Sequence, residues 1–240
     1  MTVSEFSDQF DVLYNNITSN QAPGLNEYEK SVFLTKAQEE LVKNYLSPKG
    51  NPHQEGFDDS AKRQADFSLL MKSTTLSPET GPKFDQRSIL YSYPSDVFIT
   101  LGEQLYVNDN PYVVVPISFG DYDRQMAKPY KYPPKYQAWR LITGTKNTGG
   151  GGKVPIVEII GVFASTPTYY IRYVKRPNPI ILVDLSSIQN SLTIHGESTA
   201  MTSELPEEIH EEILQRAVEL AKNAWQGDVN TSVQLGQRSE

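Results

Sequence analysis

The spacing of apolar residues changes twice along this 240-residue chain, and that order constrains the fold more than any single motif. Residues 1–85 carry apolar stripes at helical spacing, and residues 86–200 carry short β-rich runs bounded by turns. Residues 201–227 return to helical spacing. The sequence therefore predicts an α+β fold, with a helical core from the N- and C-terminal helices and a β-rich insertion that contains one short helix.

Two amphipathic helices are predicted at the start of the chain. The first breaks at residues 21–24, and the second begins after Asn26, whose side chain can cap it. Glu29, three residues later, completes a capping box. We expect a third helix over about residues 59–72 and a loop over residues 76–81. The stripes of the first two helices are Phe6, Phe10, Leu13 and Ile17, and Leu34, Ala37, Leu41 and Tyr45.

The middle of the chain predicts strands, with one helix inserted among them. Ser118 and Asp121 have capping-box spacing, so we expect a helix over residues 118–128 that Pro129 stops. The four-glycine run at residues 149–152 predicts a flexible hairpin tip. The predicted strands are Ile89–Tyr91, Leu105–Val107, Tyr112–Val115, Ala138–Gly144, Val154–Phe163, Tyr169–Lys175 and a short one at Leu192–His195.

The last helix is predicted from both its ends and its stripe. Pro206 suits the first position, acidic residues fill the first turns, and Gly227 is placed to end the helix. The polar tail that follows, residues 228–240, is predicted to extend from the core and dock onto a partner, with Gln234 and Leu235 as contact candidates. The apolar stripe is Ile209, Ile213, Ala217, Leu220 and Ala224.

Composition and motifs indicate no catalytic, cofactor or metal site. The chain has no cysteine, which excludes disulfides and thiolate ligands, and its formal net charge is -7. The glycine run lacks the Ser or Thr of a phosphate loop, since Val154 follows Lys153. Asp121 and Asp123 lie where a helix should begin, and we expect His210 to form a surface ion pair. No signal peptide or membrane span is expected.

Basic and aromatic residues alternate between residues 124 and 140. Such a stretch can bind single-stranded nucleic acid by charge and stacking, or it can form a protein interface with Tyr, Trp and Arg anchors. The acidic net charge favours a protein interface. The candidate partner-interface residues are Tyr130, Tyr132, Tyr136, Trp139, Arg140, Arg172 and Arg176, with Gly150 and Gly151 at the glycine tip.

Three stretches, in this order, resemble structural proteins of crAss-like phages of Bacteroidales. They are residues 126–134 running into 138–141, residues 170–180, and residues 204–213. The family members are ring proteins of the head–tail connector, and their layout is similar to that of short-tailed phage adaptor proteins. The resemblance implies a non-enzymatic virion protein, assembled in the host cytoplasm, that forms a cyclic homo-oligomer of about twelve copies.

The same resemblance implies the partners. They are the portal protein, an adjacent tail ring or tail hub protein, and packaged DNA in the central channel. Two alternatives stay open. A nucleic-acid-binding accessory protein would use the 124–140 stretch, and a virion-associated hydrolase would need a carboxylate pair across one cleft.

Overall fold

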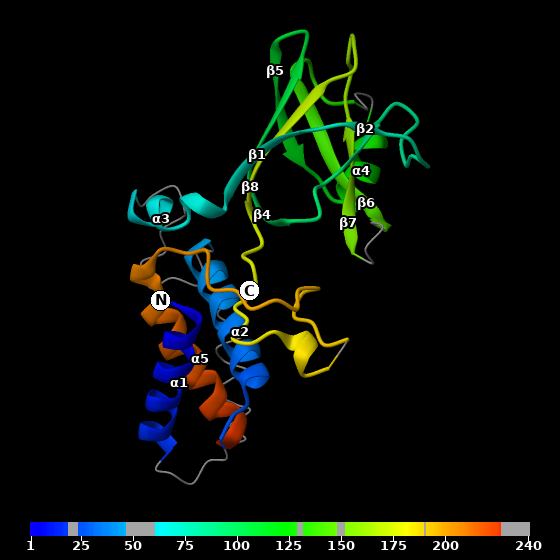
Figure 1. The fold of residues 1–240 in the computed structure, drawn as a ribbon. Helices are drawn as coiled ribbons and strands as arrows, with labels where there is room; N and C mark the ends of the chain where they lie inside the picture. Colours follow the sequence, from blue (N-terminus) through cyan, green and yellow to red (C-terminus); the bar gives the residue numbers. More distant parts are fainter. Residues whose placement is uncertain (19–23, 47–60, 129–131, 148–151, 190, 227–240) are drawn as a thin grey trace. The chain divides into compact units, whose positions relative to one another are not determined.

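The computed structural model describes the chain except for residues 19–23, 47–60, 129–131, 148–151, 190 and 227–240. The chain divides into two compact units, each described by itself (Figure 1). The helical unit comprises residues 1–70 and 176–240, and the β unit comprises residues 71–175. The β-rich segment was predicted at residues 86–200, so the β unit begins and ends earlier in the chain than that prediction.

Three long helices build the helical unit: α1 (Val3–Thr18), α2 (Glu27–Leu46) and α5 (Glu207–Gln226). α5 packs against both α1 and α2. The capping box at Asn26 is confirmed, because the Glu29 N–H donates to Asn26 Oδ1 at 2.8 Å and the Asn26 N–H donates to Glu29 Oε2 at 2.9 Å. The fully or almost fully buried apolar side chains of these helices include Phe6, Phe10, Leu34, Ala37, Val42, Ile213, Leu214, Ala217 and Val218.

A buried polar stripe on α2 holds the segment that returns from the β unit. Ser31, Thr35 and Gln38 are spaced along one helix face, and their side chains bond to the backbone of alternate residues in the returning segment. Ser31 and Thr35 are four residues apart, a helical rise of about 6 Å, which nearly matches the rise of about 6.6 Å of two extended residues. Thr35 and Gln38 are three residues apart, so the second step is shorter, about 4.5 Å. The bonds join Leu182 N to Ser31 Oγ at 3.0 Å, Ile180 N to Thr35 Oγ1 at 3.1 Å, Thr35 Oγ1 to Ile180 O at 3.2 Å and Gln38 Nε2 to Asn178 O at 2.8 Å.

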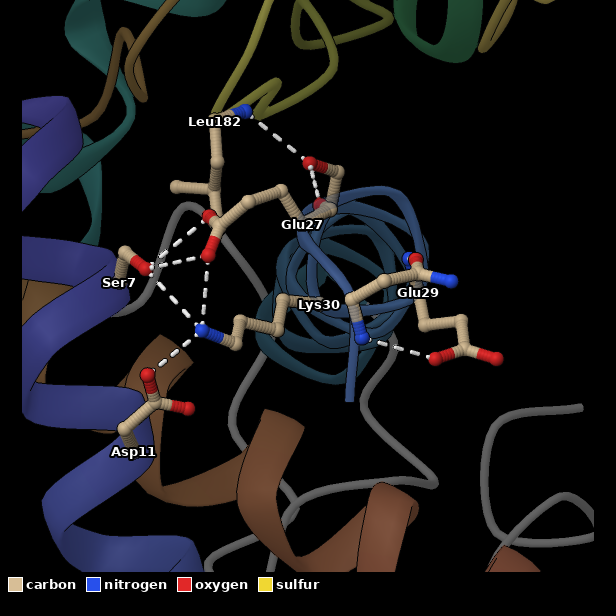
Figure 2. A network of polar contacts seen from close by, with 8 residues as sticks. Ser7, Asp11, Glu27, Glu29, Lys30 and Leu182 are labelled. Carbon is tan, nitrogen blue, oxygen red and sulfur yellow. Dashed lines mark hydrogen bonds and ion pairs between the residues drawn. The ribbon is translucent and has the colours of Figure 1, made fainter. Parts of the chain in front are cut away.

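A buried lysine joins α1 to α2 (Figure 2). Only 3% of the Lys30 side chain is exposed, and its ammonium lies 2.7 Å from Asp11 Oδ2 and 2.9 Å from Glu27 Oε1. It also donates to Ser7 Oγ at 3.1 Å. Burial alone would lower the pKa of Lys30, but the hydrogen bonds to Asp11 and Glu27 outweigh burial and raise the pKa.

The β unit contains one eight-stranded sheet in the order β1-β8-β4-β5-β6-β7-β3-β2. Neighbouring strands are antiparallel except β5 and β6, which are parallel. β1 and β2 are the two ends of this order, yet only Ser77 separates them in sequence. Two residue steps span about 7 Å at most, so the sheet must curl until its ends meet. The strands are β1 (Met71–Leu76), β2 (Pro78–Glu79), β3 (Ile89–Ser92), β4 (Val97–Val107), β5 (Asn110–Pro116), β6 (Gln137–Asn147), β7 (Lys153–Ile160) and β8 (Thr168–Lys175).

The curled sheet encloses an aromatic core, and one helix packs outside it. Helix α4 (Phe119–Met126) lies in the connection between parallel strands β5 and β6, which cannot be joined by a tight turn. Its predicted cap is confirmed, because the Asp121 N–H donates to Ser118 Oγ. Six predicted strands each overlap an observed one. The inner cluster contains Leu76, Tyr91, Tyr93, Leu105, Ala138, Val157, Ile159, Tyr169, Ile171 and Tyr173, and the outer cluster under α4 contains Tyr122, Trp139, Leu141 and Ile160.

The predicted third helix is wrong at its C-terminal end. α3 covers only Ala61–Asp66, a 3-10 turn η3 follows at Ser68–Leu70, and strand β1 begins at Met71. β1 pairs along its whole length with β8, and this non-local pairing overrides the helical spacing. The expected loop over residues 76–81 contains the end of β1 and the short strand β2.

Two further expectations about the C-terminal part are wrong. Leu192–His195 forms no strand but contributes one isolated bridge, Ile194 to Glu197, after the short 3-10 helix η4 (Leu185–Ser187). His210 is 3% exposed rather than at the surface, because α5 packs against both α1 and α2. In the α5 stripe, Leu220 is half-buried and Ala224 is exposed, while the neighbouring residues Leu214, Val218 and Ala221 are buried.

Candidate subunit-contact surfaces

Trp139 and Arg140 are neighbours on β6, so their side chains lie on opposite faces of the sheet. Arg140 points inward, where its guanidinium donates to Glu103 Oε1 at 2.7 Å and to the Tyr93 hydroxyl at 3.1 Å. Burial would lower the pKa of Arg140, but the bond to Tyr93 and the charge of Glu103 raise it. Arg140 therefore joins strands within the subunit, whereas Trp139 belongs to the outer cluster under α4.

The tyrosines of the 124–140 stretch occupy different surroundings. Tyr132 packs against the outer cluster, and its hydroxyl lies 3.4 Å from Asp85 Oδ2. Tyr136 is 45% exposed with a positive φ of 66°, and the Lys135 ammonium lies 4.8 Å from its ring centroid. Tyr130 lies outside the described residues. The structure therefore places Tyr132 and Trp139 in one cluster, whereas Tyr136 is exposed and lies outside that cluster.

The remaining predicted interface residues lie on other elements or outside the described residues. Arg172 is on β8, where its guanidinium lies 3.4 Å from Met71 Sδ, and Arg176 belongs to the helical unit, 3.7 Å from Glu39. Gly150, Gly151, Gln234 and Leu235 lie outside the described residues. On either side of the glycine run, Asn147 and Lys153 are antiparallel partners, so β6 and β7 form the predicted hairpin.

Two carboxylates of the β unit have structural partners. Asp121 accepts a hydrogen bond from Ser118 Oγ at 2.7 Å, which lowers the pKa of the Asp121 carboxyl and serves the α4 cap. Glu158 is fully buried and accepts from Phe84 N–H at 2.6 Å and Ser88 Oγ at 2.8 Å, so it holds the turn before β3. In the described part of the chain, no three His, Asp or Glu side chains form a group that could hold a metal ion.

A cavity of about 510 Å³ lies between α4 and the start of β6, and we call it the basic groove. Arg124 and Lys128 line it on α4, and Trp139 lines it on β6. Arg124 is 79% exposed and pairs with Asp121 one turn away. Lys128 is exposed, and no ion pair joins it to a carboxylate among the described residues. The other lining residues are Ile117, Asp121, Gln125, Pro134 and Gln137.

A second hollow, of about 290 Å³, lies between α1 and α5, and we call its lining the acidic surface. Val12 on α1 is 60% exposed there, although it is a large apolar residue. Asp8 lies one turn before Val12, and Glu211 lies on α5; both are exposed. The rest of the lining consists of Gln9, Leu13, Leu214 and Gln215.

The two units carry opposite net charges. Residues 71–175 contain 12 Lys and Arg against 8 Asp and Glu, a formal charge of +4. The helical unit contains the other 10 basic and 21 acidic residues, a formal charge of -11. The whole-chain charge of -7 hides this division, which a charge count by segment would have found.

A further cavity of the β unit, about 670 Å³, lies beside β2 and the β6–β7 hairpin. Phe84 and Phe119 meet edge to face at its lining and are 48% and 44% exposed. Lys146 pairs with Glu79 there at 2.7 Å. Among the described helices, none has the length and apolar character that a membrane span requires.

Each of the two units carries its own exposed surface, which is typical of a protein that binds other subunits. Comparison with known proteins identifies the class of protein. The family described as phage tail ring protein 3/4 matches residues 1–232, and the chain belongs to this family of crAss-like phage ring proteins. It is 52% identical over 245 residues to "Ring protein 4/5" of Bacteroides phage crAss001, covering 100% of both chains. It is 31% identical over 231 residues to "Ring protein 3" of the same phage, covering 92% of this chain and 95% of the relative.

Proposed function

We propose that this chain is a non-enzymatic structural subunit of a ring in the head–tail connector of a crAss-like phage virion. The observation that carries the proposal is the match to one ring protein at 52% identity, which covers 100% of both chains. The second match supports it, because two different proteins named as ring proteins in one phage are both similar to this chain.

The proposed ring is a closed cyclic homo-oligomer of about twelve copies, a number that would match a portal. A cyclic ring of more than two copies needs two different contact surfaces on each subunit. The chain offers such surfaces, because the helical and β units differ in fold and in the sign of their net charge. The helical core with its β insertion also fits the proposed likeness to short-tailed phage adaptor proteins.

The proposed partners along the tail axis are the portal protein and an adjacent ring or tail hub protein. Packaged DNA would pass through the central channel. The chain's net charge of -7 supports this role, since like charges keep DNA from adhering to the channel wall. Assembly would take place in the host cytoplasm, before the connector joins the virion.

Quantitative mass spectrometry of purified virus particles tests the proposal directly. We expect this chain and the portal protein at a fixed ratio near one, or at a small whole multiple of it. The ratio has this form whichever ring of the connector the chain builds. Absence of the chain from intact particles would end the connector proposal.

The C-terminal tail, residues 228–240, is the proposed docking segment for the portal or a neighbouring ring. We expect a chain that lacks these residues to fold normally and to lose retention on immobilised portal protein, because the tail follows the end of α5 and is too polar for the core. A scrambled tail of the same composition is the matched control. Retention equal to that of the full chain would show that the tail is not the docking segment.

A further inference from the structure

We propose that the acidic surface of one subunit docks into the basic groove of the next copy of this chain. Val12 would enter the groove against Trp139, while Asp8 and Glu211 would face Arg124 and Lys128. The inference rests on the proposed ring, and it names the two surfaces that the ring contact would use. The occupant of the basic groove is thus a second copy of this chain.

The apolar part of the contact is an exposed residue that meets a cavity. Val12 is 60% exposed, whereas Phe6 and Phe10 on the same helix are fully buried. The basic groove, at about 510 Å³, has room for an aliphatic side chain beside Trp139, of which 7% is exposed. Removing Val12 from water against an aromatic ring is favourable and is typical of the centre of a protein interface.

The polar part of the contact is charge complementarity. In the described part of the chain, no ion pair joins Asp8 or Glu211 to a cation; Glu211 accepts only a hydrogen bond from Gln215. On the other side, Lys128 has no carboxylate partner among the described residues. Asp8 and Glu211 on one surface would therefore face a groove that holds two cations and one carboxylate, Asp121, so the contact joins surfaces of opposite net charge.

The net charges of the two units also favour a contact between the helical unit of one copy and the β unit of the next. A helical unit of -11 repels another helical unit and attracts a β unit of +4. A contact between unlike units of successive copies is heterologous, because each subunit uses a different surface toward each neighbour. Such a contact can repeat around a closed ring.

Charge reversal gives the first test, by sedimentation velocity of the full chain at up to about 1 mM protein. Lys128→Glu and Asp8→Lys should each weaken self-association about tenfold, because each puts like charges across the contact. Mixing the two variants should restore it. In an alternating ring, every contact between the variants joins either two wild-type surfaces or two reversed ones.

Matched controls carry the same charge changes elsewhere. Lys153→Glu on β7 and Glu197→Lys in the helical unit alter net charge equally, and both residues are exposed and lie outside the two surfaces. We expect association within about twofold of the unmodified chain for both. Controls that weaken association as much as Lys128→Glu, or a mixture that stays dissociated, would overturn the proposal.

Disulfide trapping gives the second test, because the chain has no cysteine of its own. In the double variant Val12→Cys/Gln125→Cys, mild oxidation should produce covalent dimers and larger species, since Gln125 lines the basic groove. Val12→Cys/Lys153→Cys is the control and should not. A disulfide closed within one chain overturns the proposal, as does a monomer at every protein concentration.

The same double-cysteine chain separates this inference from the proposed function. If the chain is present in particles at a fixed ratio to portal protein but gives no disulfide between subunits, the ring function stands and this contact is wrong. If the unmodified chain is absent from particles, the proposed ring function is wrong, whatever the disulfide result.

Discussion

Replacing Thr35 with Val tests how the helical unit holds the chain that returns from the β unit. The two side chains have nearly the same shape, so the change removes one hydroxyl and little volume. That hydroxyl, in a residue only 3% exposed, donates to Ile180 O at 3.2 Å and accepts from Ile180 N–H at 3.1 Å. Without it, a buried donor and a buried acceptor both lose their partner.

Each buried backbone group left without a partner costs about 1–3 kcal/mol. The added methyl group recovers about 0.8 kcal/mol by burial. We therefore expect Thr35→Val to lower the free energy of unfolding by about 1–5 kcal/mol. For a unit of this size that corresponds to a decrease in Tm of roughly 2–20 °C.

Urea unfolding followed by far-ultraviolet circular dichroism at a helical wavelength measures this loss in the helical unit. Thr35→Ser is the matched control, because it keeps the hydroxyl. We expect the Ser variant to be more stable than the Val variant and to have a free energy of unfolding close to that of the unmodified chain. A loss below about 0.5 kcal/mol for Thr35→Val would refute the reasoning, since it would mean that Ile180 finds other partners at no cost.

Two further predictions concern buried charges of the helical unit. Lys30→Met should lower the free energy of unfolding less than the double change Asp11→Asn/Glu27→Gln. The carboxylates are 49% and 40% exposed and can return to water, whereas removing them leaves the buried ammonium without a carboxylate, at a cost of about 3–5 kcal/mol. Urea midpoints in the reverse order would contradict this. Burial lowers the pKa of His210 below that of the unfolded chain, so the unfolded state binds more protons and stability should fall as pH drops below about 6.5. His210→Gln should flatten that dependence in urea midpoints measured across this pH range, and an unchanged slope would argue against the buried neutral imidazole.

Local signals in the sequence predicted local structure well. Asn26 with Glu29 and Ser118 with Asp121 fixed two helix starts, because a cap involves only residues three apart. The β-rich runs located most strands for a similar reason, since β-branched and aromatic residues favour extended backbone. These features do not depend on distant partners.

Features that depend on distant residues could not be read this way. Met71–Leu76 is a strand because β8, about a hundred residues later, pairs with it. His210 has acidic neighbours in sequence that indicate a surface, but its Nε2 donates to Leu205 O at 2.8 Å and its Nδ1 lies 2.8 Å from the Met1 amine. The polar stripe of α2 contains Ser31 and Thr35, whose spacing is visible in the sequence while their backbone partners are not.

The candidate interface residues show the same limit. The sequence singled out the 124–140 stretch, and the structure puts Trp139 in the basic groove but turns Arg140 inward to Glu103. Side chains of adjacent strand residues point to opposite faces of the sheet, so consecutive basic and aromatic residues do not form one surface. The acidic surface was missed because Asp8 and Glu211 come from helices at opposite ends of the chain.

The pairing of β1 with β8 leads to a prediction about the whole architecture. Met71 and Val174 are direct partners, so the chain enters and leaves the β unit at backbone positions about 5 Å apart. A two-residue Asn-Gly turn can bridge Met71 and Val174, and residues 72–173 can then be removed without stretching the helical unit. Its hydrogen bonds from α2 to Ile180 and Leu182 lie wholly on the retained side. We expect the shortened chain to fold, with a cooperative urea transition that Thr35→Val weakens as it does in the full chain. A shortened chain that is unfolded by circular dichroism while the full chain is folded would show that the helical core needs the β unit, and that the insertion is not an independent module.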